Sequence, residues 1–391
     1  MILADLDREL AARIAAGVTD GTFPPAVTRI VPGRTWRRAP DQNPASFATS
    51  IAFELAAVTD RPPARLAASL ARALRRLHWI DAAEPARDGY LTITVTPRAL
   101  GQAAARLAAA GSGAAASTAL GGSSATVAPW PDPAAAPTWQ HAWQNHAAAM
   151  TSRLAQAAGA HATVTTTTIS RERGKPGANA APTMRQQSEG SGPPRRDGAV
   201  ADAVDWFGAP GVRYGLARTS PGRVAELGRT LLQPGASGPD PLYPVRQAHT
   251  SADSALRWAA ELDCRPGDPG DLLGLPAEQA LLGLLPWLPV RVAAAAARGR
   301  PDELPFFLEA VSDAWLAVRL AAPALPFGGR AAPADLAVAG ARLTLANAVR
   351  TVLACGLALT GAHLGLDLGG STGGVPPWAT IEPVPKRVTE G

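Results

Sequence analysis

Two apolar stretches decide the fold: PAEQALLGLLPWLPVRVAAAAARGRPDELPFFLEAVSDAWLAVRLAAPALPF at residues 276–327 and ARLTLANAVRTVLACGLALTGAHL at residues 341–364. Both carry their apolar side chains in helical patterns, and a Pro/Gly-rich break separates them. Apolar residues that recur at the helical period form a stripe that is buried against other helices. The two stretches therefore predict a C-terminal helical bundle.

We do not expect these stretches to cross a membrane. Pro286, Pro289 and Arg291 interrupt the first stretch, and Arg350 lies inside the second. A transmembrane helix needs roughly 20 consecutive apolar residues. The sequence therefore predicts buried faces of bundle helices and no membrane partner.

The composition favours a polyanionic partner only modestly. The 391 residues leave room for two or three domains, and the formal net charge is +5. Lys175 and Lys386 are the only lysines, so almost all of the positive charge is arginine, which binds phosphate in a forked geometry. A genome biased towards Ala, Arg, Gly and Pro codons explains the same composition. The charge alone therefore does not identify the partner.

The sequence offers no pattern for a metal site, a disulfide or export. Cys264 and Cys355 lie far apart, and His141 and His146 are five residues apart, which does not place them on one helical face. The first ten residues, MILADLDREL, lack the apolar core of a signal peptide. We therefore expect a cytoplasmic protein without a metal or another cofactor.

The rest of the chain is expected to form a small α+β domain and an irregular middle. Residues 5–16, 46–58 and 63–77 have helical patterns, and residues 90–100 alternate like a strand. The middle has the order strand, loop, helix, strand. The expected units are an α+β domain over 1–110, a flexible linker over 111–123, a middle region over 124–200 with a disordered loop at 170–197, and a helical domain over 198–391 with a tail at 366–391.

Aromatic and basic residues in these helices have ordinary structural interpretations. Arg72, Arg75 and Arg76 make a basic face that is solvated or, as a second interpretation, contacts an RNA backbone. Four tryptophans in apolar helical patterns are expected to be core residues. They are Trp206, Trp258, Trp287 and Trp315.

The last helical stretch carries the most specific pattern of the chain. It reads A-R-L-x-L-x-x-A-V-R-x-V-L-x-x-G-L-x-L-x-G from Ala341, and Glu278 opens an E-x-x-L-L pattern in the first stretch. This resembles the anticodon-binding (DALR) domain of the arginyl-tRNA synthetases. The resemblance implies a DALR-type bundle and tRNA as a partner. The matching residues are Arg342, Leu343, Leu345, Ala348, Val349, Arg350, Val352, Leu353, Gly356, Leu357, Leu359 and Gly361.

A second resemblance lies in QNPASFATS at residues 42–50. The segment is similar to the one that opens a helix in the N-terminal additional domain of the same family, which touches the tRNA at the D-loop. By this resemblance Asn43, Phe47 and Thr49 are expected to contact tRNA. The Gly-Asp pair of the family is missing, and the alternative is that Phe47 packs the start of a helix.

A third resemblance covers DPLYPVRQAHTSADSALRWAAEL at residues 240–262, which is similar to a long helix near the anticodon arm. It implies tRNA contacts by Tyr243, Arg246, Gln247 and His249, and the bundle resemblance adds Arg291. Gln247 stands where the family has an aromatic side chain, so base-specific recognition is expected to be weak. The alternative for His249 is a hydrogen-bonded histidine at the helix start with no ligand role.

Both ATP-binding signatures of the family are degenerate. In PDPAAAPTWQH at residues 131–141, Thr138 and Gln140 replace a histidine and a glycine that hold phosphates, and only His141 remains. In the second signature the flexible lysine loop has become a Gly-Pro-Pro-Arg run. Its degenerate positions are Pro193, Pro194 and Arg195.

The resemblance predicts a mainly α protein with a degenerate remnant of a Rossmann-like catalytic domain in its middle. We expect a truncated pseudo-enzyme that binds tRNA as a delivery, sequestering or regulatory factor. The alternative is a protein-interaction subunit for a synthetase or for an enzyme that uses aminoacyl-tRNA; a new active site around His141 is a third hypothesis. A continuous arginine-lined surface would favour RNA binding, and a broad apolar patch would favour a protein partner.

Overall fold

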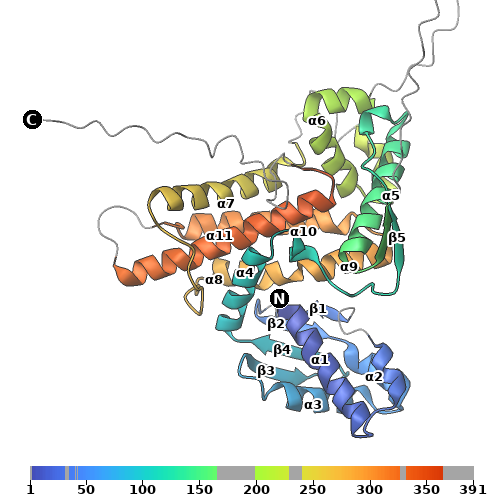
Figure 1. The fold of residues 1–391 in the computed structure, drawn as a ribbon, viewed down its shortest axis with the longest axis vertical. Coiled ribbons are helices and arrows are strands. Elements are labelled where there is room, and N and C mark those ends of the chain that lie inside the picture. The colour runs from blue at the N-terminus through green and yellow to red at the C-terminus, as the bar shows by residue number, and fades with distance from the viewer. Residues whose placement is uncertain are drawn as a thin grey trace, which may run out of the picture.

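The computed structural model describes residues 2–30, 35–39, 41, 43–164, 199–228, 240–325 and 332–363 of the chain. This part is mainly α, with a four-stranded sheet near the N-terminus and a two-stranded sheet in the middle. Figure 1 shows the N-terminal sheet and its helices at one end of the molecule, with the long helices α7, α10 and α11 stacked beyond them. The predicted mainly α fold with a small N-terminal α+β part is confirmed.

The N-terminal part is an antiparallel sheet in the order β1-β2-β4-β3, with helices packed on it. Strand β4 buries alternate residues, Leu91, Ile93 and Val95, as expected for a strand with one face on a core. Helix α3 buries an apolar stripe that includes Leu66 and Leu70. The elements are α1 (Ile2–Thr19), the 3₁₀ helix η1 (Pro25–Arg29), β1 (Trp36–Arg38), β2 (Ser46–Thr49), α2 (Ile51–Thr59), α3 (Pro63–Leu74), β3 (Ile80–Pro85), β4 (Leu91–Val95) and α4 (Pro97–Ala110).

The helix predicted over residues 46–58 begins later than expected. Residues 46–49 form β2, which pairs with β1 on one side and β4 on the other. Phe47 lies four residues before Ile51, so its spacing continued the apolar pattern of the helix in the sequence. All four side chains of β2 are buried, and the Thr49 hydroxyl hydrogen-bonds the Thr35 hydroxyl at 2.5 Å. Pairing on both edges therefore prevails over the local pattern.

The middle of the chain forms a parallel βαβ unit. Strands β5 (Ser124–Val127) and β6 (His161–Val164) pair in parallel, and α5 (Trp139–Ala157) connects them. A short 3₁₀ helix, η4 (Pro133–Ala135), lies between β5 and α5. The order strand, loop, helix, strand is confirmed, and α5 packs against both α6 and α9.

The helical part contains one kinked helix and a bundle. Helix α6 bends at Gly208, which has φ 72° and ψ 159°, a conformation that glycine adopts readily, and Pro210 follows it. Helix α11 packs against α4, α7 and α10 (Figure 1). The elements are α6 (Ala199–Arg218), η5 (Pro221–Glu226), α7 (Tyr243–Glu261), α8 (Pro276–Leu284), η7 (Leu285–Trp287), α9 (Leu288–Arg298), α10 (Glu303–Ala321) and α11 (Pro333–Leu359).

A buried ion pair joins the two apolar stretches of the bundle. The Arg342 Nε donates to the Glu278 carboxylate at 2.7 Å, and the Glu278 side chain is 1% exposed. The same carboxylate accepts a hydrogen bond from the backbone N–H of Leu275, which caps the start of α8. The pair therefore fixes the first turn of α8 against the middle of α11.

Residues 111–123, predicted to be a flexible linker, begin with packed structure. Residues Gly111–Ala115 form the 3₁₀ helix η3, which lies against α11, and Ala114 and Ala115 are buried. The Cys355 thiol donates to the Gly111 carbonyl at 3.0 Å. The Gly/Ala/Ser composition here serves close packing, because small side chains let η3 approach the helix.

Two of the four tryptophans predicted to be core residues are exposed. Trp287 and Trp315 are 4% and 1% exposed, as expected, but Trp206 and Trp258 are 64% and 56% exposed. Trp258 lies on the face of α7 that points away from α10 and α11, because Ala252, Ala255 and Ala259 fill the buried face. The helical pattern placed it on the wrong side.

Two stretches of the described chain are long and apolar enough to cross a membrane by length and composition, Pro276–Arg298 and Pro333–Leu359. In each, 67% of the apolar window is buried against the rest of the protein. Their apolar side chains are therefore accounted for by the core.

Asp7 provides a test of the N-terminal core. Its carboxylate accepts a hydrogen bond from Trp36 Nε1 at 2.6 Å, and burial raises the pKa of Asp7 to about 6, although this hydrogen bond lowers it. Because the folded-state pKa exceeds the unfolded value, stability falls as the pH rises from about 4 to 6 and stays reduced above it. We expect Asp7→Asn to raise the free energy of unfolding by about 1–2 kcal/mol at pH 7. Urea unfolding at pH 4.5 and pH 7 measures this; an equal effect at both pH values would contradict it.

Candidate nucleic-acid interface

The N-terminal sheet meets the bundle at a tight junction. Phe47 of β2 is fully buried, and its ring centroid lies 5.8 Å from that of Trp287. At Gly283 of α8, a Cβ atom would overlap the carbonyl oxygen of Pro44. Backbone therefore touches backbone at Gly283 and Pro44, next to the contact between the two aromatic rings.

Arginines gather at the edge of this junction. Arg38 lies opposite Phe47 in the β1–β2 register, and Arg291 of α9 lies over the Trp287 ring at 5.6 Å. Burial and the neighbouring charge of Arg38 lower the pKa of Arg291, which Glu303 partly offsets. Neither Arg38 nor Arg291 forms an ion pair within the described part of the chain. The junction therefore has a positive charge that a phosphate could neutralise.

The residues of QNPASFATS have different positions at this junction. Asn43 is exposed, and its side-chain oxygen accepts from the backbone N–H of Ala45 at 3.0 Å, which forms the turn before β2. Phe47 and Thr49 are 0% exposed. Phe47 packs in the core, but from strand β2 against Trp287 and not at the start of a helix as its alternative interpretation had it, and the Thr49 hydroxyl hydrogen-bonds that of Thr35 just before β1. Only Asn43 of the three is accessible to a partner.

The second expected group lies on α7. Tyr243 is 50% exposed, Gln247 is exposed, and Arg246 is exposed and paired with Asp240 at 3.2 Å. His249 is buried, and burial lowers its pKa. Its Nδ1 has no hydrogen-bond partner in the described structure, so the predicted hydrogen bond is not seen at that atom.

The structure does not bring the two groups together. Helices α10 and α11 pack against α7, while the junction is formed by β2, α8 and α9 (Figure 1). Arg291 belongs with Asn43 at the junction, whereas Tyr243, Arg246 and Gln247 share the outer face of α7. A ligand that contacts both groups must extend across the bundle.

The loop before α5 is closed by its own side chains. Thr138 caps α5: its hydroxyl accepts from the backbone N–H of His141 at 3.3 Å and lies 2.8 Å from His141 Nδ1. Gln140 and His141 are exposed. The helix N-terminus, where phosphate would bind in a nucleotide site, is thus occupied by a side-chain cap.

Side chains also fill the space beside the segment that follows β5. Arg153 lies 4.0 Å over the Trp130 ring, and His146 stacks on Trp130 at 5.1 Å. Arg213 donates to the Pro131 carbonyl at 3.4 Å. Burial, with the nearby positive charges of Arg213 and Arg153, lowers the pKa of His146 to about 3, so the ring is neutral. A cavity beside His146 has a volume of about 10 Å³, room for about one water.

The degenerate positions of the second signature cannot be located in the described part of the chain. Pro193, Pro194 and Arg195 lie outside the described residues, as do the loop at 170–197 and the tail at 366–391. Among the residues that the structure describes, no group of three or more His, Cys, Asp or Glu side chains could hold a metal ion.

Sequence reasoning missed two residues of these surfaces. Arg38 lies in a three-residue strand that no pattern marked, and Trp258 was assigned to the core but is 56% exposed. Trp287 was correctly assigned to the core, and it also supports Arg291, while Trp258 extends the outer face of α7. Arg37 and Arg38 are both exposed, so β1 shows no alternation that could have marked Arg38 in the sequence.

Comparison with known proteins relates this chain to one family. Residues 34–95 match the family described as the arginyl tRNA synthetase N terminal domain. The arginine–tRNA ligase of Pseudarthrobacter chlorophenolicus is 32% identical over 168 residues, which cover 41% of this chain and 30% of the ligase. That of Frankia alni is 34% identical over 163 residues, which cover 41% of this chain and 29% of the ligase.

These matches show a protein related to the arginyl-tRNA synthetases. The chain spans about 30% of the length of the curated relatives it matches. The matched residues 34–95 include Arg38 and Asn43 of the junction.

Proposed function

We propose that this relative of the arginyl-tRNA synthetases binds tRNA without aminoacylating it, as a delivery, sequestering or regulatory factor. The observation that carries the proposal is the junction, where Arg38, from the family-matched segment, and Arg291, from the bundle, lie close enough for their charges to interact and neither forms an ion pair with a residue that the structure describes. Arginine binds phosphate oxygens in a forked geometry, so this edge suits an RNA backbone.

The middle of the chain supports the non-catalytic part of the proposal. Thr138 caps the helix N-terminus, and Arg153 and Arg213 bond to carbonyl groups of the segment after β5. Adenylate chemistry needs donors directed at phosphates in an open site. We therefore interpret the βαβ unit as a remnant of a Rossmann-like catalytic domain, and α7–α11 as a DALR-type bundle.

Two readouts on one preparation test this function. We expect tRNA to bind with a log–log salt slope of about −0.7 to −0.9 per contacted phosphate, and we expect no arginine-dependent ATP–pyrophosphate exchange. Arg38→Glu should weaken binding by about tenfold or more at low salt, because a phosphate contact becomes a repulsion. Filter binding across a salt series measures the salt slope and the loss of affinity, and a separate assay on the same preparation measures the exchange.

The control for Arg38→Glu makes the same charge change elsewhere. Arg223 is 60% exposed and pairs with Glu226 away from the junction, so Arg223→Glu should alter affinity by less than about threefold. Equal losses for the two variants would show only a general charge effect. Exchange above a heat-inactivated control would refute the non-catalytic proposal.

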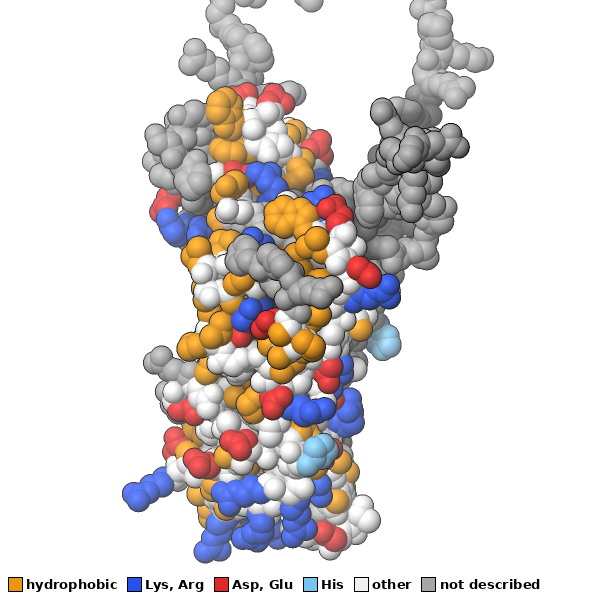
Figure 2. Space-filling model, turned by 90° about the vertical axis from the view of Figure 1, so that its left-hand side faces the viewer, with side chains coloured by type: hydrophobic (Ala, Val, Ile, Leu, Met, Phe, Trp, Pro, Cys, Tyr) orange, Lys and Arg blue, Asp and Glu red, His pale blue; other side chains and the backbone are white. Residues whose placement is uncertain are grey.

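A second candidate function is a protein-interaction subunit for a synthetase or an enzyme that uses aminoacyl-tRNA. It is favoured by exposed apolar side chains where α7 and α10 end: Trp258 at 56%, Leu262 at 64% and Leu320 at 91%. Figure 2 shows hydrophobic side chains over the middle of this side of the molecule. Such patches are typical of protein contacts. Absence of tRNA binding even at low salt would favour this function.

A further inference from the structure

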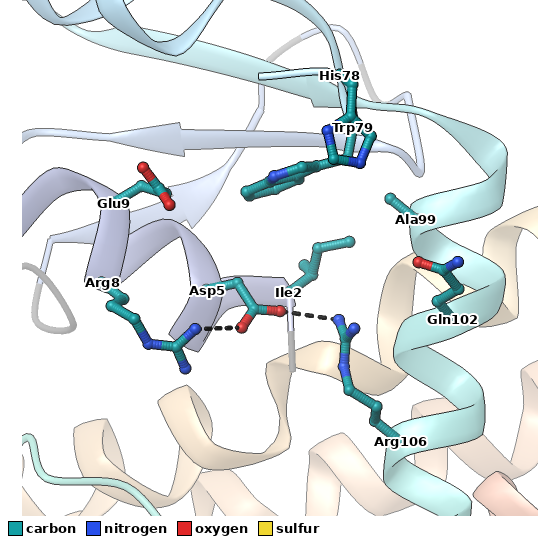
Figure 3. Close-up of a pocket in the computed structure, with 9 residues that line it drawn as sticks. All are labelled: Ile2, Asp5, Arg8, Glu9, His78, Trp79, Ala99, Gln102 and Arg106. Atoms are coloured by element: carbon teal, nitrogen blue, oxygen red, sulfur yellow. Dashed lines mark hydrogen bonds and ion pairs between the residues drawn. The ribbon is translucent and has the colours of Figure 1, made fainter. Parts of the chain in front are cut away.

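A cavity of about 240 Å³ lies between α1, α4 and the segment that joins α3 to β3. Figure 3 shows the Trp79 ring on one side of it and Ile2 and Asp5 on the opposite side. Ligand pockets for complete small molecules are typically about 300–1,000 Å³. This cavity is therefore large enough for one chemical group of limited size, and the flat Trp79 ring in its wall suits a planar one.

Ion pairs fix the floor of the cavity and cancel its charge. The Asp5 carboxylate lies 3.1 Å from Arg8 and 2.8 Å from Arg106, from two different helices (Figure 3). Glu9 is the second acidic residue of the lining and lies 3.7 Å from Arg13. Two acids and two arginines line the cavity, so it offers no excess charge to a small ion. An uncharged aromatic ligand that stacks on Trp79 fits it better.

Hydrogen-bonding groups stand around the Trp79 ring. Figure 3 shows the Glu9 carboxylate and the Gln102 amide on opposite sides of the cavity. An amide both donates and accepts, while a carboxylate accepts only. A nucleobase carries donors and acceptors on its edges and a flat face for stacking. Guanine in particular presents two adjacent N–H donors that one carboxylate can accept.

A row of arginines leads towards this cavity. Arg65 and Arg72 lie seven residues apart on one face of α3, and Arg76 lies just beyond its end, two residues before His78. All three are exposed, and none forms an ion pair with a residue that the structure describes. Figure 2 shows arginines gathered at the end of the molecule that holds the N-terminal sheet. An RNA backbone along α3 would bring its bases to Trp79.

We propose that this cavity binds one unpaired nucleobase of an RNA whose backbone runs along α3. Trp79 stacks on the base, and Glu9 and Gln102 hydrogen-bond its edges. Single-stranded nucleic acids bind in this way, with a basic track for phosphates and an aromatic side chain for a base. The inference rests on the proposed function, because the base belongs to the bound RNA.

The experiment measures tRNA affinity and maps the contact. We expect Trp79→Ala to weaken tRNA binding by about tenfold and Glu9→Gln by about threefold, since a stacked base and one of its hydrogen bonds are lost. Trp206→Ala, at an exposed tryptophan on α6 outside the cavity, is the matched control and should leave affinity unchanged. Ultraviolet crosslinking of the wild-type complex, followed by mass spectrometry, should place an RNA adduct on Trp79.

The outcomes separate this inference from the proposed function. If the wild type binds tRNA while Trp79→Ala and Glu9→Gln bind equally well, the inference is wrong and the proposed function stands. Glu9→Gln guards against misfolding, because Glu9 lies on the surface of α1 with its side chain 31% exposed. If the wild type binds no tRNA, the protein is titrated with each of the four nucleoside monophosphates. Saturable quenching of tryptophan fluorescence that Trp79→Phe alters supports base binding in the cavity. No saturable quenching, or quenching that Trp79→Phe leaves unchanged, refutes the inference.

Discussion

Replacing Arg342 by alanine is expected to lower the free energy of unfolding by about 3–5 kcal/mol. The change leaves the Glu278 carboxylate, 1% exposed, without its partner inside the bundle. An unpaired buried charge costs far more than the ion pair contributes. Chemical denaturation with two spectroscopic probes measures the loss and checks that one transition is present.

Two further variants identify the cause of this loss. The double variant Arg342→Ala/Glu278→Gln should recover at least half of it, because glutamine is neutral and can still cap α8. Arg265 and Asp263 form an ion pair with side chains 86% and 90% exposed, so Arg265→Ala should cost less than about 0.5 kcal/mol. Failure of the double variant to recover stability would mean that lost packing by the arginine stem, and not the unpaired charge, dominates.

Replacing Gly283 by valine is expected to cost about 3 kcal/mol and to loosen the junction. The new Cβ overlaps the Pro44 carbonyl oxygen, and neither backbone can move without disturbing the Phe47–Trp287 contact. Hydrogen exchange of the β2 amides should become faster, while exchange in α10 changes little. If RNA binds across the junction, affinity should fall together with this protection.

Gly274 is the matched control for this substitution. A Cβ at Gly274 meets no atom within 4 Å. Gly274→Val should therefore leave both stability and exchange close to those of the wild type. If Gly283→Val proved as mild as this control, α8 and the turn at Pro44 would have to be able to separate, and the junction would not be a fixed surface.

The helical bundle could be predicted from the sequence because the residues that form its sequence pattern are also those that stabilise it by packing and ion pairing. Glu278 and Arg342, which open the two matching stretches, pair with each other, and Gly356 gives space to the Leu308 side chain. Arg350, which also matches the family pattern, pairs with Asp253 of α7 at 3.2 Å. Residues that pack or pair between helices recur at the helical period and can therefore be recognised in a single sequence.

The candidate interface was harder to predict because it depends on contacts between distant segments. Phe47 had the right spacing for a helix, but its position is set by strands β1 and β4 and by Trp287, 240 residues later. Arg38 becomes significant only because β1 places it beside Arg291. Trp79 acquires its neighbours from α1 and α4. No local pattern contains such information.

One hydrophobic cluster includes residues from Ile2 of α1 to Leu357 of α11, and the 3₁₀ helix η3, which directly follows α4, packs against α11. The distance between the outer face of α7 and the N-terminal arginines is thus fixed. An RNA long enough to reach both surfaces binds the second one at a high effective concentration, whereas an RNA that reaches only one of them gains no affinity from the other. Discrimination can then arise from the length and bend of the RNA rather than from its bases, so shortening or lengthening a helical arm by a few base pairs would matter more than changing an anticodon.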